Sequence, residues 1–461
     1  MRSSSFRPLV LAVAVAVAVA VAGCSFIPVH ETPAPPVAAT WADAGTATGT
    51  PAADLAWADF LTDARIRALV EVALANNRDL RIAVLNVEQV RAQYGVQRAD
   101  QLPSVGVGAS VARAANADAY AVGLTVSAFE LDLFGRVKSL SEAALARYLA
   151  SDEGRRAAQV ALIAAVANAE LALRADDEQL QVTRSTLESR EASLKLARVR
   201  FEGGVAAEGE LRGAESLVAG ARANLATLTR QRFQDLNALV LLLGQPLPDD
   251  LPAAPPLTAL TLAELPVGLP SEVLLQRPDI RQAEQQLIAA NANIGAARAA
   301  FFPRISLTGS FGTASTDLSG LFENTAWSFT GQLLQPLFDA GRNQANLEAT
   351  RAAHAIAVAQ YERAIQVAFR EVADALAGRA TLGDQLAALQ AQAQAEARRV
   401  ELAELLLRGG VASQIDRLDA ERSLLIARQA VVLLQQARLQ NSVLLYRVLG
   451  GGAGPSLVAA R

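Results

Sequence analysis

The chain has 461 residues, with 46 acidic and 42 basic side chains and a formal charge of −4, which gives no support to nucleic-acid binding. Hydrophobic residues make up 52% of the chain but aromatic residues only 5%, which favours closely packed, alanine-rich helices over a large aromatic core. A single cysteine excludes a disulfide within the chain and a cysteine-based metal site. The sequence has no G-x-S-x-G, Walker or H-E-x-x-H motif, so we expect neither an enzyme nor a bound cofactor.

The N-terminus has the layout of a secretory signal. Two arginines precede an unbroken apolar run, Leu9–Ala22, which is shorter than the roughly 20 residues of a membrane-spanning helix. The end of this run, Val21-Ala22-Gly23-Cys24, resembles the lipobox of bacterial lipoproteins. The resemblance implies that residues 1–23 are removed as a lipoprotein signal peptide and that Cys24 becomes a lipidated first residue. In such lipoproteins an aspartate directly after the cysteine implies retention in the inner membrane. This chain has Ser25 at that position, which implies the outer membrane.

An internal repeat organises the rest of the chain. The segments that start at Asp79 and Asp279 align at a constant offset, and further on Gly135-Arg136 aligns with Gly341-Arg342. We therefore predict two copies of one unit. A lipid-anchored extended segment is predicted at 24–55 and the first repeat at 56–245. A proline-rich linker at 246–270 leads to the second repeat at 271–450, and a flexible tail follows at 451–461.

Each copy begins with a helix of moderate length, Leu80–Ala99 and Ile280–Ala300, which stops before a proline. Strand-like segments follow, in which apolar residues alternate with small or polar ones, as in AYAVGLTVSAFEL from Ala119 and WSFTGQLLQ from Trp327. Alternation over about ten residues is typical of a membrane β-strand and equally of a half-buried strand in a soluble sheet. Two strands in each copy predict four in the chain.

A very long helical run without proline follows the strands of each copy. In the second run, apolar residues recur at spacings of three and four between Leu382 and Leu407, as in a coiled coil. The glycine pairs Gly203-Gly204 and Gly409-Gly410 interrupt the runs and predict that the chain reverses there. We expect a helix of about 65 residues, roughly 100 Å long, and a return helix of about 35 residues.

Four strands cannot close a membrane barrel, because single-chain barrels begin at about eight strands. An open sheet edge in lipid leaves backbone groups without hydrogen bonds. If the strands lie in a membrane, the chain must therefore oligomerise. Strand number alone allows a dimer, a trimer or a tetramer.

Four sequence blocks, in order, resemble those of the outer-membrane efflux proteins of the TolC/OprM group, and especially the NodT-type efflux lipoproteins. The blocks are FELDLFGRV, the segment Gly268–Gly312, LLQPLFDAGR and LLRGGVASQIDRLDAERSL. The resemblance implies a mainly α fold with a membrane β-barrel, in which each protomer supplies four strands and long coiled-coil helices. It also implies a trimer, with a twelve-stranded barrel continued by an α-helical periplasmic tunnel.

The same resemblance implies the channel component of a tripartite efflux system in the outer membrane. Such a component is a passive conduit that carries drugs and other toxic small molecules out of the cell. The implied partners are two further copies of the chain, a periplasmic membrane-fusion adaptor, an inner-membrane pump and outer-membrane lipid. No cofactor is implied beyond the covalent lipid on Cys24.

The helix reversals are expected to form the periplasmic tips and to carry a gate. Family members often have an acid directly after the Gly-Val, where this chain has Ala206 and Ala412. The nearest equivalent acids are Glu210 and Asp416, which in a trimer would make a ring of about six carboxylates. Arg417 is expected to pair with an acid of a neighbouring copy. The alternative for all three is a solvated charge on a helix surface.

Small residues at the tips, Gly203, Gly204, Gly409 and Gly410, would let another helical hairpin approach, so we expect the adaptor to dock there. The arginines after the strands, Arg136 and Arg342, either cap the junction with the helices or contact lipid headgroups. Five aromatic residues are candidates for a membrane-interface girdle: Tyr120, Trp327, Phe329, Phe301 and Phe302. For Phe301 and Phe302, core packing is the alternative.

Two alternative functions remain open from the sequence. The first is an outer-membrane outlet for type I-like secretion. The second is a periplasmic coiled-coil lipoprotein scaffold without a pore. A scaffold would explain the lipobox and the helices, but not the amphipathic strands at matching positions of the two repeats.

Overall fold

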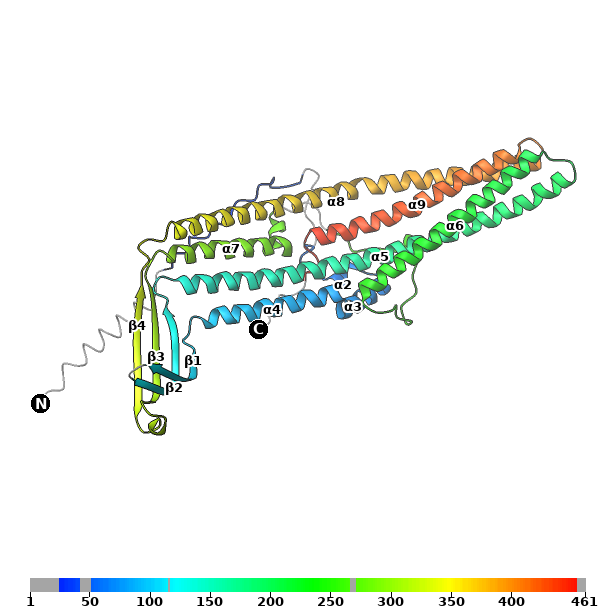
Figure 1. Ribbon diagram of the computed structural model, residues 1–461. Coiled ribbons are helices and arrows are strands. Elements are labelled where there is room, and N and C mark those ends of the chain that lie inside the picture. Colours follow the sequence, from blue (N-terminus) through cyan, green and yellow to red (C-terminus); the bar gives the residue numbers. More distant parts are fainter. Residues whose placement is uncertain (1–24, 42–50, 115–116, 266–270, 454–461) are drawn as a thin grey trace.

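The computed structural model describes residues 25–41, 51–114, 117–265 and 271–453. The predicted signal peptide, the lipidation candidate Cys24 and most of the predicted tail lie outside these residues. The described chain forms a long bundle of helices, with a β-sheet at one end and two helical hairpins at the other (Figure 1). The predicted fold class, long helices combined with four strands, is confirmed.

The two halves of the chain contain the same elements in the same order. The first half has α4 (Arg78–Ala99), β1 (Val105–Ala114), β2 (Ala117–Leu131), α5 (Arg136–Glu202) and α6 (Glu208–Leu243). The second has α7 (Pro278–Ala299), β3 (Arg304–Ser315), β4 (Thr325–Leu334), α8 (Arg342–Arg408) and α9 (Gln414–Val448). Shorter helices complete the described chain: α2 (Trp57–Phe60), α3 (Ala64–Asn76), η1 (Leu257–Ala259), η2 (Ser271–Gln276) and η3 (Leu318–Gly320).

The helix lengths agree closely with those predicted. The long helices α5 and α8 have 67 residues each, and the return helices α6 and α9 have 36 and 35. The two shorter helices begin two residues earlier than predicted. Asn77 accepts a hydrogen bond from the backbone N–H of Leu80 and so caps α4. Pro278 occupies the first turn of α7, where its fixed φ suits a helix start.

Four helices leave the sheet side by side. Contacts join α4 to α5, α5 to α7 and α7 to α8, so the helices follow the order of the strands (Figure 1). The return helices α6 and α9 pack on α5 and α8 at the far end of the bundle. Near the sheet, the four long and shorter helices thus lie in one layer in the order α4, α5, α7 and α8.

The four strands form one antiparallel sheet in the order β1-β2-β3-β4, so β1 and β4 each keep one edge unpaired within the chain. Gly123 and Gly312 lie opposite each other at the centre of the sheet. A Cβ on Gly123 would lie 2.5 Å from the carbonyl oxygen of Phe311, and one on Gly312 would collide with the carbonyl oxygen of Val122. The two central strands therefore need glycine at this crossing.

The register gives the sheet one apolar face and one polar face. A row across all four strands consists of Val107, Leu124, Phe311 and Trp327, which are between 51% and 79% exposed in the single chain. A neighbouring row, on the opposite face because side chains alternate, consists of Gly106, Thr125, Ser310 and Ser328. A half-buried strand in a soluble sheet would hide its apolar face, and this sheet does not. The alternation thus fits lipid on one side and water on the other.

The main hydrophobic core lies midway along the bundle, where α2 and α3 pack on the long helices. The rings of Phe60 and Tyr446 stack there with centroids 4.1 Å apart, and the Tyr446 hydroxyl donates to the carbonyl oxygen of Leu55 at 2.6 Å. Trp41 is buried against this cluster and stacks on Phe369 of α8. This core ties the N-terminal segment to both repeats.

An extended N-terminal strap, residues 25–41, runs along the bundle from the sheet end to the central core. Its first residues lie on α7. The Phe26 ring stacks on Phe302 at 4.7 Å, and Asn291 and Arg298 donate to the carbonyl oxygens of Pro28 and Phe26. The strap therefore brings its first described residue, Ser25, to the level of the junction between sheet and helices.

Candidate functional site: the helix tips and the strand–helix junction

The helix reversals have the geometry that the glycine pairs predicted. Gly204 and Gly410 both adopt φ +72°, which only glycine reaches without strain. In each tip the backbone N–H of the third residue after the helix donates to a carbonyl oxygen of the last helical turn, as Val205 does to Arg200 and Val411 to Leu406. These bonds satisfy carbonyl groups at the end of the helix. Val205 is 69% and Val411 77% exposed, so the outermost point of each hairpin is apolar.

Glu210 and Asp416 occupy the same position, the third residue of the return helix, in the two repeats. Their partners differ. Glu210 pairs with Arg200 at 3.3 Å, whereas Asp416 accepts hydrogen bonds from the hydroxyl and the backbone N–H of Ser413. These two bonds hold the pKa of Asp416 below its usual value, so it is ionised at neutral pH.

Arg417 makes several contacts within its own chain. Its side chain is only 13% exposed, and it pairs with Glu421 at 3.0 Å and with Glu404 at 3.8 Å. It also donates to the hydroxyl of Ser193 on α5. Arg417 thus joins α5, α8 and α9 within one protomer, and its pairing with an acid of a neighbouring copy stays a prediction.

Buried polar atoms without partners surround this link. Among the described residues, Arg417 Nε, Glu421 Oε2 and Gln414 Oε1 are buried and make no hydrogen bond. Such atoms are costly to bury. Glu421 is therefore an additional member of the tip site, which the sequence predictions missed. The only signal for it in the sequence is an Ala-Glu pair that aligns between the two repeats, at Ala214-Glu215 and Ala420-Glu421.

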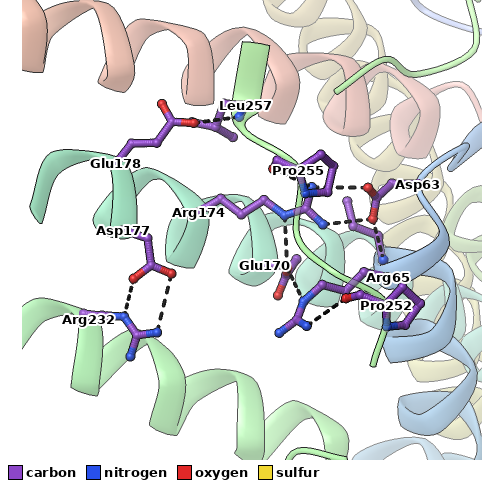
Figure 2. A network of polar contacts seen from close by, with 11 residues as sticks. Asp63, Arg65, Glu170, Arg174, Asp177, Glu178, Arg232, Pro252, Pro255 and Leu257 are labelled. Carbon is purple, nitrogen blue, oxygen red and sulfur yellow. Dashed lines mark hydrogen bonds and ion pairs between the residues drawn. The ribbon is translucent and has the colours of Figure 1, made fainter. Parts of the chain in front are cut away.

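A second polar cluster, absent from the sequence predictions, lies at the level of the central core (Figure 2). Arg174 of α5 donates to Asp63 at 2.9 Å and to Glu170 at 3.0 Å, and Arg65 donates to Glu170 at 2.8 Å. Burial raises the pKa of Asp63, but the hydrogen bond and charge of Arg174 and the backbone N–H groups of Ile66 and Arg65 together lower it further, so the pKa stays below its usual value. The same arginines also bind the linker, through the carbonyl oxygens of Pro252 and Pro255.

At the strand–helix junction, Arg136 and Arg342 are the first residues of α5 and α8. Arg136 makes two hydrogen bonds of 2.7 Å to the carboxylate of Glu130. Of the girdle candidates, Trp327 and Phe329 are exposed on the apolar face of the sheet. Phe302 instead stacks between Phe26 and Phe134, which favours the packing alternative for that ring.

Comparison with known proteins places the chain among outer-membrane transport components. The family model described as outer membrane efflux protein matches residues 69–245 and 269–451. The toluene efflux pump outer membrane protein TtgC of Pseudomonas putida is 44% identical over 93% of each chain, and the outer membrane protein OprJ of Pseudomonas aeruginosa is 46% identical over 95% of each. The solved open state of the MtrE outer membrane channel of Neisseria gonorrhoeae superposes with a TM-score of 0.87 at 41% identity, and covers 93% of this chain and 99% of that one.

Proposed function

The chain belongs to the outer membrane efflux protein family, and on that premise we propose that three copies assemble into one conduit across the outer membrane and the periplasm. As a member of this family it is an outer-membrane channel component of an efflux system. The observation that carries the assembly is the four-stranded sheet, which has an apolar and a polar face and two unpaired edges. In a trimer, β1 of one copy pairs with β4 of the next and closes a twelve-stranded barrel.

The helices continue this barrel as a tunnel. A helix of 67 residues is about 100 Å long at 1.5 Å per residue, which suits a span of the periplasm better than packing within a globule. The side-by-side order of α4, α5, α7 and α8 supports the same closure as the sheet, since each helix extends one strand.

The conduit transports small molecules passively, and its partners provide the energy. TtgC is named for toluene efflux, and we extend export of small toxic molecules to this chain. The partners are an energised pump in the inner membrane and a periplasmic adaptor that reaches the tips. The exposed Val205 and Val411 beside the flexible glycine pairs Gly203-Gly204 and Gly409-Gly410 support docking of an apolar helical hairpin at this end.

Cys24 carries lipid that inserts in the inner leaflet of the outer membrane. Support comes from the strap, since Phe26 and the backbone of Pro28 are held on α7 at the level of the junction. A lipid on the preceding cysteine would reach the leaflet that surrounds the base of the barrel. The barrel keeps the protein in the membrane in any case, so the lipid assists assembly.

The resting gate lies at the tips. Glu210 and Asp416 repeat around the trimer as a carboxylate ring that favours cations. Arg417, with Glu421 and Ser193, holds the second hairpin of each copy against α5. Opening then requires these links within a protomer to loosen, in addition to any contact between copies.

The conduit is tested by single-channel recording of the detergent-purified protein in a planar bilayer, with Cys24→Ala alongside. We expect a trimer whose channels are stable and persist without the lipid. A monomer that does not conduct, and that leaves the membrane once Cys24 is replaced, would refute the conduit and favour a scaffold.

The gate is tested in the same bilayers with the double substitution Glu210→Gln and Asp416→Asn. Conductance should rise, because the substitutions weaken the pair of Glu210 with Arg200 and the hydrogen bonds of Asp416 with Ser413 that hold the tips in their resting state. Glu191→Gln is the matched control, since Glu191 forms a similar exposed pair with Arg222 away from the tip. Equal conductance of the double variant and this control would place the gate elsewhere.

A further inference from the structure

A cavity of about 210 Å³ lies where the sheet meets the helices. It is lined by the end of β2, by the turn between α7 and β3, by the end of β4 and by the first residues of α5 and α8. Its charged lining consists of Arg136, Arg304 and Arg342 together with Glu130 and Asp132. Three guanidinium groups thus share one small cavity with two carboxylates.

The register places this charge on the lumen side. Arg304 and Ser306 lie on the face of β3 that also carries Ser310, the polar face. Glu130 is the partner of Ser306 across the sheet, and Arg136 is held by Glu130. In a membrane barrel the polar face lines the interior, so these groups border the opening between tunnel and barrel.

The arginines are also accessible from the tunnel. A second cavity of about 350 Å³ is lined by Arg136 and Arg304 and extends along the helices past Asn346 and Thr350. Arg342 precedes Asn346 by four residues and so lies on the same side of α8. A solute that moves along this side of the tunnel meets all three arginines before it enters the barrel.

The cationic charge is only partly neutralised. The carboxylate of Glu130 is shared by Arg136 at 2.7 Å and Arg304 at 3.5 Å. The two repeats carry the same arginine after the strands, but where the first has Glu130 the second has Pro336, so Arg342 lacks that counter-charge. Asp132 accepts a hydrogen bond from the backbone N–H of Lys138 and caps α5.

Above this level the polar face of the sheet carries small and neutral side chains, as in the row Gly106, Thr125, Ser310 and Ser328. We propose that Arg136, Arg304 and Arg342, repeated around the trimer, form a cationic ring that accepts the carboxylate or phosphate groups of anionic solutes and gives the upper conduit a preference for anions. The proposal rests on the conduit proposed above. It assigns to the upper end a charge preference opposite to that of the acidic tips.

The test is the reversal potential of single channels of the full-length protein under a tenfold KCl gradient, which reports the ratio of chloride to potassium permeability. We expect Arg304→Gln and Arg342→Gln each to lower this ratio about twofold or more, the effect of one unit charge at roughly 8 Å in water. Glu130→Gln should raise it. If these residues had only a structural role, the arginine substitutions and Glu130→Gln would not change the permeability ratio in opposite directions.

Arg113→Gln is the matched control, because Arg113 is an exposed arginine near the far end of the sheet and pairs only loosely with Asp118, at 3.8 Å. Arg342→Lys keeps the charge and should keep the ratio, which separates charge from packing. Conducting channels whose ratio is unchanged in both glutamine variants would overturn the ring. Absence of conductance in both the unsubstituted protein and the Glu210→Gln/Asp416→Asn double variant would refute the conduit itself, and the ring with it.

Discussion

Arg174 provides a direct test of how the central region is held together. Its side chain is only 4% exposed, and its two carboxylate partners, Asp63 and Glu170, are 9% and 2% exposed. Arg174→Met keeps most of the side-chain volume but leaves Asp63 with only its helix-cap hydrogen bonds and Glu170 with Arg65 alone. Removal of one partner from a buried ion pair typically costs about 3–5 kcal/mol of unfolding free energy, and we expect a loss in that range.

Guanidinium unfolding in detergent, followed by tryptophan fluorescence, measures this loss. Trp41 and Trp57 contact the central core, whereas Trp327 lies in the sheet, so a Trp327→Phe background makes the signal local. Arg232→Met is the matched control, because Arg232 pairs with Asp177 at the nearby surface. An exposed pair contributes below about 1 kcal/mol. Equal effects of the two substitutions would show that the buried cluster does not stabilise the centre.

Three further outcomes are expected. Gly312→Ala should abolish trimer formation on unheated gels because its Cβ would collide with the backbone of β2. Gly309→Ala should not, because its Cβ would lie 3.7 Å from the carbonyl oxygen of Ser328, an ordinary contact distance; intact trimers of both variants would refute this reasoning. Burial and a hydrogen bond with a neighbouring carboxyl raise the pKa of Asp176 to about 7. The folded protein then binds more protons than the unfolded one, and its stability falls as the pH rises from about 4 to about 7. Asp176→Asn should remove this dependence of the unfolding free energy on pH, and Asp177→Asn should retain it. The same dependence in both variants would contradict the assignment of the pKa near 7 to Asp176. Ser413→Ala should cost about 1 kcal/mol at the start of α9, seen as faster amide exchange there, and unchanged exchange would rule out the cap.

Local pattern was sufficient for the elements themselves. The lengths of α5 and α8 followed from the absence of proline between the strands and the glycine pairs, because proline and glycine act within a turn of their own position. The strand faces followed from alternation, since successive side chains of a strand point to opposite sides. The equivalence of the two halves was visible in matched residues such as Arg136 and Arg342.

Long-range contacts were not predictable in the same way. Arg417 bonds to Ser193, 224 residues away in the same chain, a contact that the sequence did not indicate. The central cluster joins Asp63 to Arg174, 111 residues apart, and no spacing rule connects them. The sequence has Glu130 before Arg136 in the first repeat and Pro336 at the equivalent position before Arg342 in the second. The consequence of this difference became clear only from the cavity that Arg136, Arg304 and Arg342 share.

The sequence by itself thus determined the repeat, the approximate lengths of the long helices and the two faces of the sheet, because each depends on residues a few positions apart. Only the tertiary structure decided which charges meet in the bundle, how the strap reaches the junction and which arginines share the cavity there. Those arrangements depend on helices that start far apart in the chain and come together through packing, which no local periodicity encodes.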